Sequence, residues 1–441
     1  MTVDGDTLDP SDEWIAAWND AGRAHLTELS ERLAAFYAGD DSVDLDLADP
    51  RSQADADRVL RSVTDLNAAG RWQRARELFD PAWGPMLGHV EQNTTPLGAV
   101  ALLGQDDILV VRGSPGEEGG SAVHLSGGEA TDVPDVHGVT CSRNRDHLVL
   151  ATSAGLELRD ARLPFDRSAT AQLLPWPTEA TRFDVEHMQV SDDGQRVAVS
   201  CHRQGIFLAS RGPGEPPWQQ IYPDPPTPVA DMTHVALSRD GNRLAWGHQD
   251  STHQLAEIGP GGVVSRYADV GPLTEYPHFA AFSDSGDHVA LNSCHFYSGA
   301  TRAFAWAGNR DAKIKAYSDD PSAPVIDEHL RVYAGCWVPI ELPSTDGSAR
   351  LDGGFALAGA GVLRVVGLDG TAASVVGIGS SAGGVDYCPE TGRLAVASHS
   401  GVLHVFDPAV EELPGRVDGV RALREVTRWL LWSHLPRPVR W

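Results

Sequence analysis

The stretch VSDDGQRVAVS (190–200) combines a short apolar strand, a polar turn ending in glycine, and a second apolar strand. The same pattern recurs in LSRDGNRLAWG (237–247), FSDSGDHVALN (282–292) and CPETGRLAVAS (388–398). The turn glycines are 47, 45 and 106 residues apart, and the last gap corresponds to two periods. A period of about 40–50 residues built of short strands is typical of a radial β-propeller. The repeat predicts an architecture but no activity, because propellers carry many unrelated functions.

Strand-like segments outside these four copies extend the repeat over residues 86–415. We therefore predict a mainly β fold, a seven-bladed β-propeller. Its inner strands are expected to begin near Leu97, His137, Glu186, Thr233, His278, Leu330 and Gly384. The last blade lacks an outer strand after Asp407, so we expect the segment 86–92 to supply it. Such closure would remove the open edges of the first and last sheets.

Both ends of the chain have helical patterns. Residues 1–85 are predicted to form an N-terminal helical region, with helices near residues 13–38, 54–69 and 72–79. Residues 416–441 are predicted to form a C-terminal amphipathic helix and tail. The first 60 residues carry 15 acidic residues and four Arg, whereas residues 416–441 carry six Arg and two acidic residues. Their opposite charges and shared tryptophans predict that the two ends pack together beside the propeller.

The composition of the 441-residue chain excludes some classes of protein. Its net charge of −26 argues against a nucleic-acid binder, which needs clustered Lys and Arg, and favours a basic partner. Its five cysteines include no CxxC pair and are expected to be free thiols in a reducing compartment. The sequence contains no signal-peptide pattern and no apolar run of 18 residues. We expect a cytoplasmic protein without a membrane span.

Acidic residues and histidines recur together just before the predicted inner strands. These pairs are Asp135/His137, Asp184/His187, Asp231/His234, Glu275/His278 and Asp327/His329. A second set of histidines follows the second strand of a blade: His202, His248, His295 and His399. In a four-stranded antiparallel blade, the start of the inner strand and the turn between the second and third strands lie on one face. The pattern therefore predicts a His/Asp-rich face around the mouth of a central channel.

Two interpretations of this face remain open. Imidazoles can bind a transition metal, and a neighbouring carboxylate can orient the ring, so His187, His234 and His278 are the candidate metal ligands. Alternatively, these histidines are structural: they hydrogen-bond to loop carbonyls and neighbouring carboxylates and so hold the blades together. A structural need that recurs in each blade would explain why the residue recurs. We expect no cofactor, and keep a transition metal at the hub as the alternative. No HExxH, GxSxG, Walker or strand–helix GxGxxG motif appears.

The turns and apolar-Ala-apolar strands resemble those of the WD40-like β-propeller superfamily, including its bacterial members with an S-x-D-G turn. The Gly-His and Trp-Asp dipeptides of true WD40 repeats are mostly missing, and Phe406-Asp407 is the nearest counterpart. We therefore do not expect the hydrogen-bonded tetrad of that family in this chain.

We predict a non-enzymatic protein-interaction scaffold that binds a protein or peptide, with a basic one favoured by charge, through the His/Asp-rich face. The alternative is a metal- or small-molecule-binding propeller, enzymatic in one version, with a histidine-lined hub.

Overall fold

The computed structural model describes residues 12–37, 40, 42–44, 46–114, 120–165, 171–177, 181–211, 218–223, 232–249, 251–270, 279–295, 298–306, 325–327, 331–343, 350–411 and 423–441. Its α-helices are α1 (Glu13–Tyr37), α2 (Gln53–Ala68), α3 (Trp72–Leu78) and α4 (Leu87–Gln92). Short 3-10 turns lie at Gly84–Met86, Arg182–Asp184 and Pro260–Gly262. Within these described segments, no helix is both long enough and apolar enough to cross a membrane.

The described strands form six antiparallel sheets. Five sheets have four strands each. The first contains β1 (Leu97–Leu102), β2 (Asp107–Arg112), β3 (Ser121–Ser126) and β4 (Glu129–Val133), and the second contains β5 (Gly138–Cys141), β6 (His147–Thr152), β7 (Gly155–Asp160) and β8 (Gln172–Leu174). The third contains β9 (Val185–Val190), β10 (Arg196–Cys201), β11 (Gly205–Ser210) and β12 (Trp218–Tyr222), the fourth contains β13 (His234–Leu237), β14 (Arg243–Gly247), β15 (His253–Ile258) and β16 (Val264–Val270), and the fifth contains β17 (Ala280–Phe282), β18 (His288–His295), β19 (Ser298–Ala305) and β20 (Val325–Asp327). The sixth has seven: β21 (Val332–Pro343), β22 (Arg350–Val366), β23 (Ala372–Cys388), β24 (Arg393–Ser398), β25 (Val402–Glu411), β26 (Leu423–Leu430) and β27 (Val439–Arg440).

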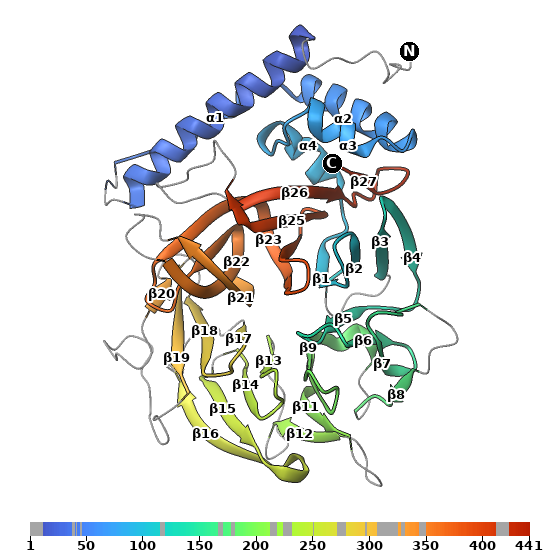
Figure 1. Cartoon of the computed structure of the whole chain (residues 1–441), viewed down its shortest axis with the longest axis vertical. Coiled ribbons are helices and arrows are strands. Elements are labelled where there is room, and N and C mark those ends of the chain that lie inside the picture. Colours follow the sequence, from blue (N-terminus) through green and yellow to red (C-terminus); the bar gives the residue numbers. More distant parts are fainter. Residues whose placement is uncertain are drawn as a thin grey trace.

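The sheets stand side by side around a common centre (Figure 1). The innermost strands contact one another in the order β1, β5, β9, β13, β17, β21 and β23, and β23 contacts β1, so the ring is closed. Apolar side chains fill the space between neighbouring sheets, as where Leu109 of β2 and Leu148 of β6 share one buried cluster. The predicted mainly β arrangement of antiparallel sheets around a centre is confirmed.

The repeated turn after the inner strand is built from serine, aspartate and glycine. In the stretch 190–200, the Ser191 hydroxyl donates to the Asp193 carboxylate at 2.6 Å and accepts the backbone N–H of Arg196 at 3.0 Å. Gly194 has a φ of 64°, in the left-handed region that glycine adopts at little cost. A Cβ atom there would lie 2.8 Å from the His147 ring of the preceding sheet. The turn is therefore a local hydrogen-bonded unit and a close contact between sheets.

The second sheet has Arg145 at the turn position that glycine holds elsewhere, with a φ of 60°. Its side chain is 2% exposed and donates twice, each time at 2.9 Å, to the carboxylate of Asp386 in β23. Asp386 also accepts the backbone N–H of Leu102 in β1 at 2.8 Å. One carboxylate thus links the first, second and last sheets at the point where the ring closes.

The predicted C-terminal helix is wrong for the residues that the structure describes. Leu423–Leu430 form β26, which pairs antiparallel with β25, and β26 pairs in turn with β27. Val426, Thr427 and Trp429 are residue types that favour strands, and the edge of β25 offers unpaired backbone groups. Pairing with this edge overrides the helical spacing of the apolar residues.

The predicted closure by the segment 86–92 is also wrong. Helix α4 begins at Leu87, after a 3-10 turn with proline in its first positions. The strand that covers β25 is β26, from the same end of the chain as the rest of its sheet. The first and last sheets are each built from consecutive strands, and their packing closes the ring.

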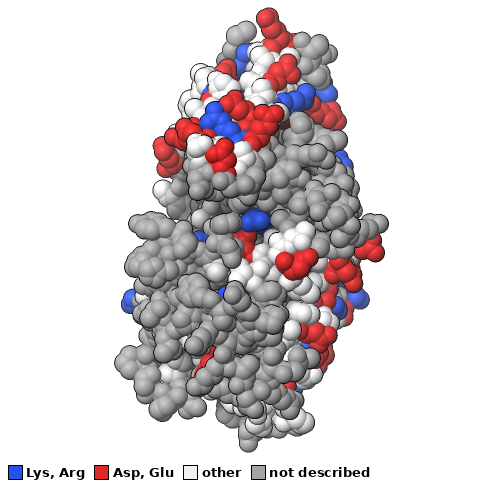
Figure 2. Space-filling view, turned by 90° about the vertical axis from the view of Figure 1, so that its left-hand side faces the viewer, with Lys and Arg blue, Asp and Glu red and all other residues white. Residues whose placement is uncertain are grey.

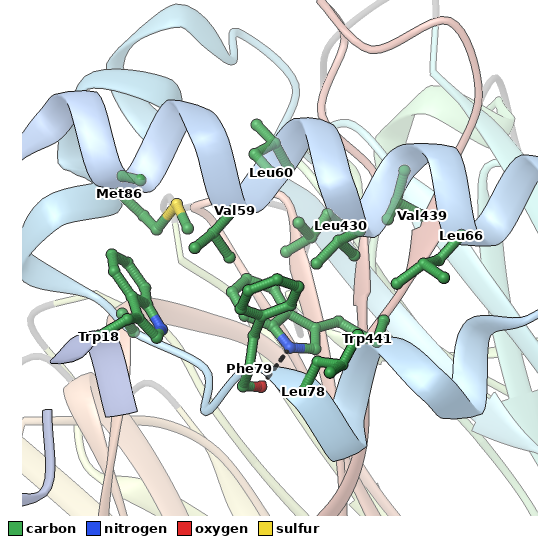
Figure 3. Close-up of a cluster of buried hydrophobic side chains, with 14 of the residues drawn as sticks. Trp18, Val59, Leu60, Leu66, Leu78, Phe79, Met86, Leu430, Val439 and Trp441 are labelled. Carbon is green, nitrogen blue, oxygen red and sulfur yellow. Dashed lines mark hydrogen bonds between the residues drawn. The ribbon is translucent and has the colours of Figure 1, made fainter. Parts of the chain in front are cut away.

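The N-terminal helices and the C-terminal strands share one hydrophobic cluster beside the propeller (Figure 3). The indole N–H of the buried Trp441 donates to the backbone carbonyl of Phe79 at 2.9 Å. The cluster contains Ile15, Trp18, Val59, Leu66, Leu78, Phe79, Leu430, Trp432, Val439 and Trp441. The predicted packing of the two ends against each other is confirmed.

A buried charge cluster crosses the same junction. Glu425 of β26 accepts bonds from Arg428 at 3.0 Å, from Arg76 of α3 at 3.1 Å and from the His404 ring at 2.7 Å. Burial opposes ionisation of Glu425, but Arg428 and Arg76 together hold its pKa well below its usual range. The carboxylate therefore stays charged and ties helix α3 to the last sheet.

Removing one partner of the Arg145–Asp386 pair would leave a buried charge uncompensated. We expect Arg145→Ala and Asp386→Ala each to lower the free energy of unfolding by about 3–5 kcal/mol. Because the two side chains act on each other, the double variant should cost much less than the sum. Urea unfolding, monitored by tryptophan fluorescence, measures the free energy of unfolding of each variant. Arg162→Ala, which breaks an exposed ion pair with Asp146, is the control and should cost less than about 1 kcal/mol. Additive costs at Arg145 and Asp386 would contradict the coupling.

Trp441→Ala would empty the centre of the cluster in Figure 3. We expect it to destabilise the junction by about 3–5 kcal/mol, from lost burial and the cavity left behind. Hydrogen exchange should then accelerate in α2 and α3, whereas β5 and β9 should keep their protection. Trp218→Ala on the outer strand β12 is the control and should leave α2 and α3 unchanged. Uniform acceleration throughout the ring would contradict a local junction.

Candidate functional site

A cavity of about 680 Å³ lies along the inner strands at the centre of the ring. Val139 of β5, Met188 of β9, Val235 of β13 and Ala334 of β21 are among the apolar residues that line it. Several ionisable residues also line it: His137, Arg143, Glu186, His187, Arg239, Asp284, Arg331, Asp386 and His399.

Arg143 crosses the ring at the end where the inner strands finish. Its guanidinium donates to the Asp284 carboxylate at 2.8 Å and to the backbone carbonyls of Tyr387 at 2.9 Å and Trp337 at 2.6 Å. Arg239 pairs with Asp192 and lies 3.8 Å from Asp284. These charged side chains join the second sheet to the fifth and sixth and line one end of the cavity.

At the opposite end, Asp135 and His137 lie where the sequence predicts. The exposed Asp135 accepts bonds from the Ser153 hydroxyl at 2.6 Å and from Arg182 at 2.9 Å. Ser153 follows the second strand of the same sheet, so the two kinds of loop do share one face. His137 lines the cavity, and burial, followed by the charge of Arg182, lowers the pKa of its imidazole. We call this end of the ring, where the inner strands begin, the loop face.

In the third sheet the partner of His202 is Glu186, which the sequence analysis missed. The His202 ring bonds to the Glu186 carboxylate at 2.8 Å, and the Thr233 hydroxyl of the next sheet donates to the same carboxylate. Asp184 instead accepts the backbone N–H and hydroxyl of Thr181, both at 2.7 Å, at the start of a 3-10 turn. The predicted Asp184/His187 pair does not form, because alternate strand residues point to opposite sides.

His187 and His234 have the same register in their sheets but different surroundings. His187 lines the cavity, and burial lowers the pKa of its imidazole. His234 is 1% exposed and lies in the core, where its Nε2 is 3.1 Å from Nδ1 of His253. The Nε2–H of His253 donates to the backbone carbonyl of Asn292, so Nδ1 accepts from His234. Placing His234 on the face is therefore wrong, and no spacing signal marked His253 as its partner.

The remaining predicted residues fall into three groups. His399 lines the cavity, and the His248 ring stacks on Tyr222 with centroids 4.3 Å apart, so both lie on the loop face. Asp327 is buried in the outermost strand β20, where Arg364 pairs with it at 2.7 Å, and its placement at the channel mouth is wrong. His295 ends β18, but its side chain lies outside the described residues, as do Asp231, Glu275, His278 and His329.

The described residues contain no group of three or more His, Cys, Asp or Glu side chains that could hold a metal ion. The rings of His187 and His234 are 6.4 Å apart and nearly perpendicular, and the latter already bonds to His253. Of the predicted ligand set, the third member, His278, lies outside the described residues.

A scan against protein-family models finds no match to this sequence, and a search of curated proteins finds none either. Among solved structures, the chain is similar to Kluyveromyces lactis Hsv2, with 12% identity, a TM-score of 0.45, and coverage of 76% of this chain and 99% of that chain. Kluyveromyces marxianus Hsv2 matches with 12% identity, a TM-score of 0.43, and coverage of 77% and 99%. Likeness at this level does not bear on the function, and the fold rests on the chain's own sheets.

Burial lowers the pKa of His253 to about 4. In the unfolded chain a histidine takes up its proton near pH 6.5, whereas folded His253 stays neutral down to about pH 4. Stability from this residue is therefore complete above pH 6.5 and is lost as the pH falls toward 4. Between pH 7 and 5 we expect wild type to lose about 2 kcal/mol more than His253→Gln, measured by urea unfolding. Between pH 7 and 9 the two proteins should change in parallel. Equal losses below pH 7 would contradict a neutral His253.

Proposed function

We propose that this protein is a non-enzymatic recognition module that binds a protein segment, with a basic one favoured, across the loop face. The observation that carries the proposal is the convergence of polar loop residues from several sheets on that one face. Asp135 with Ser153, Glu186 with His202, and Tyr222 with His248 each join residues from two different loops or strands. Loops held on a rigid scaffold are where binding surfaces are usually built.

We infer that the ring has seven blades, although its hydrogen bonds define six sheets. The long strand β22 pairs with β21 up to Gly359 and with β23 from Ala360 onward. β23 changes its partner in the same way, from β22 to β24, at Ala382. The seven-stranded sheet thus supports a reading as two adjoining blades. Seven blades would place the loop face around a closed ring with no open side.

Charge supports a basic partner. The net charge of −26 attracts cations at long range and would speed association with a basic segment. Acidic side chains are prominent over the helical region, which lies at the top of Figure 2. Within a Debye length of about 8 Å at physiological salt, local charges on the loop face should decide where such a segment docks.

We also infer a cytoplasmic location and a packing role for Cys141 and Cys336. Cys141, Cys201, Cys336 and Cys388 are free thiols, as expected in a reducing compartment. Burial raises the pKa of Cys141 to about 11 and that of Cys336 to about 12. These thiols therefore stay protonated near neutral pH, which supports a packing role and a binding function over nucleophilic catalysis.

A selected peptide tests the proposal. Peptides chosen by display against the full chain should be rich in Lys and Arg, and their affinity should fall as salt rises. Met232, which is 41% exposed, lies on the loop face just before β13, and Met232→Arg should weaken binding about tenfold through charge repulsion. Val263→Arg is the matched control, because Val263 is 62% exposed in a turn at the opposite end of the same sheet.

Biolayer interferometry measures both variants. Equal weakening by Met232→Arg and Val263→Arg would sink the loop-face assignment, and so would selection of no peptide above background. Metal analysis of the tag-free protein runs beside it. A near-stoichiometric transition metal that is lost in His187→Ala would favour the alternative, a metal-binding hub.

A further inference from the structure

The central cavity has the size and lining of a small-molecule pocket. Its volume of about 680 Å³ lies within the range of about 300–1,000 Å³ that is usual for such sites. Val139, Met188, Val235 and Ala334 give it apolar walls, and Arg143 crosses one end through bonds to three other elements. A hollow of this size that is lined by both apolar and polar side chains favours a ligand with an apolar body and a polar group.

Three polar side chains of the cavity lining have bonding capacity that the protein does not use. Gln189 accepts the backbone N–H of Leu237 at 2.7 Å through its side-chain oxygen, which leaves its amide nitrogen. Across the described part of the chain, no hydrogen bond reaches that nitrogen, the His187 imidazole or the Thr140 hydroxyl. His187 and Gln189 are two residues apart on β9 and so share one side of it.

The charged groups of the lining already have partners within the protein. Arg143 pairs with Asp284 at 2.8 Å, and Asp386 pairs with Arg145 at 2.9 Å. The other lining charges also have partners: Arg239 with Asp192, Glu186 with His202, and Arg331 over the ring of Tyr333. Because burial lowers the pKa of His187, its ring is neutral at pH 7. A charged ligand would lose its hydration in a cavity whose charged groups are already engaged with other residues.

We propose that the central cavity binds an uncharged organic molecule with an apolar body and a carbonyl or amide group that hydrogen-bonds to Gln189 and His187. The amide nitrogen of Gln189 donates to the ligand's carbonyl, and the neutral imidazole of His187 can donate or accept. Thr140 on the adjoining strand β5 offers a further hydroxyl. This binding requires no protein partner on the loop face, so it stands or falls separately from the proposed function.

Two dyes that share a naphthalene core but differ in charge test the proposal. Prodan is an uncharged naphthyl ketone, and ANS is a naphthalenesulfonate anion. In fluorescence titrations of the full chain, we expect saturable one-to-one binding of prodan, with a blue-shifted emission. Prodan should bind at least about tenfold more tightly than ANS. Absence of saturable prodan binding, or equal affinity for ANS, would overturn the proposal.

Variants place the dye in the cavity. Thr140→Phe places a larger side chain in the cavity and should weaken prodan binding about tenfold or more, whereas Thr131→Phe on the exposed strand β4 should have no effect. His187→Leu replaces the imidazole with an apolar side chain, and should weaken binding about fivefold. Circular dichroism checks folding, and Ala334→Phe, on another wall, serves as a second filling variant. Equal affinities for the filling variants and for Thr131→Phe would show that the dye binds elsewhere and would refute the site.

Discussion

The closed ring depends on the carboxylate of Asp386. This group accepts two bonds from the buried Arg145 and one from the backbone N–H of Leu102, and so joins the last sheet to the second and the first. Many circular β structures could be closed by a strand shared between their ends, but here the first and last sheets each use consecutive strands. Side-chain contacts and packing at the junction therefore replace a backbone ladder. Arg145 has a left-handed backbone at this turn, and its side chain forms the ion pair with Asp386 from that position.

A second junction joins the propeller to the helical region. Glu425 is buried between Arg428, Arg76 and His404, and the cluster around Trp441 covers them with apolar surface. A buried ion pair adds less stability than its contacts suggest, because desolvation offsets the attraction. The Glu425 carboxylate instead fixes the position of its partners, because without it the guanidinium groups of Arg428 and Arg76 would face each other. The helices are therefore held in one position against the outer strand of the last sheet.

The cavity and the loop face separate two kinds of recognition. The loop face carries exposed groups that bond to one another across loops, such as Asp135 with Ser153, and suits a broad partner. The cavity is lined by apolar side chains and by polar side chains, of which His187 and Gln189 have unused hydrogen-bonding capacity, and it suits a small molecule. Part of the candidate site could be predicted, because blade spacing places His137, His187 and His399 at one end of the ring. Glu186, Gln189 and Arg143 could not, because their roles depend on neighbours in other sheets.

The sequence by itself determined the repeat, the turn chemistry and the starts of the inner strands, because strand alternation and the Ser-x-Asp-Gly turn are local. It also indicated the N-terminal helices and the packing of the two ends through complementary composition. Only the tertiary structure decided that Leu423–Leu430 is a strand, because the free edge of β25 supplies the partner that overrides helical spacing. It likewise decided that His234 belongs to the core and His187 to the cavity lining, although both have the same register in their sheets, because His253 gives His234 a buried partner. Pairings between distant segments have no local signal, and in this chain they close the ring and shape its centre.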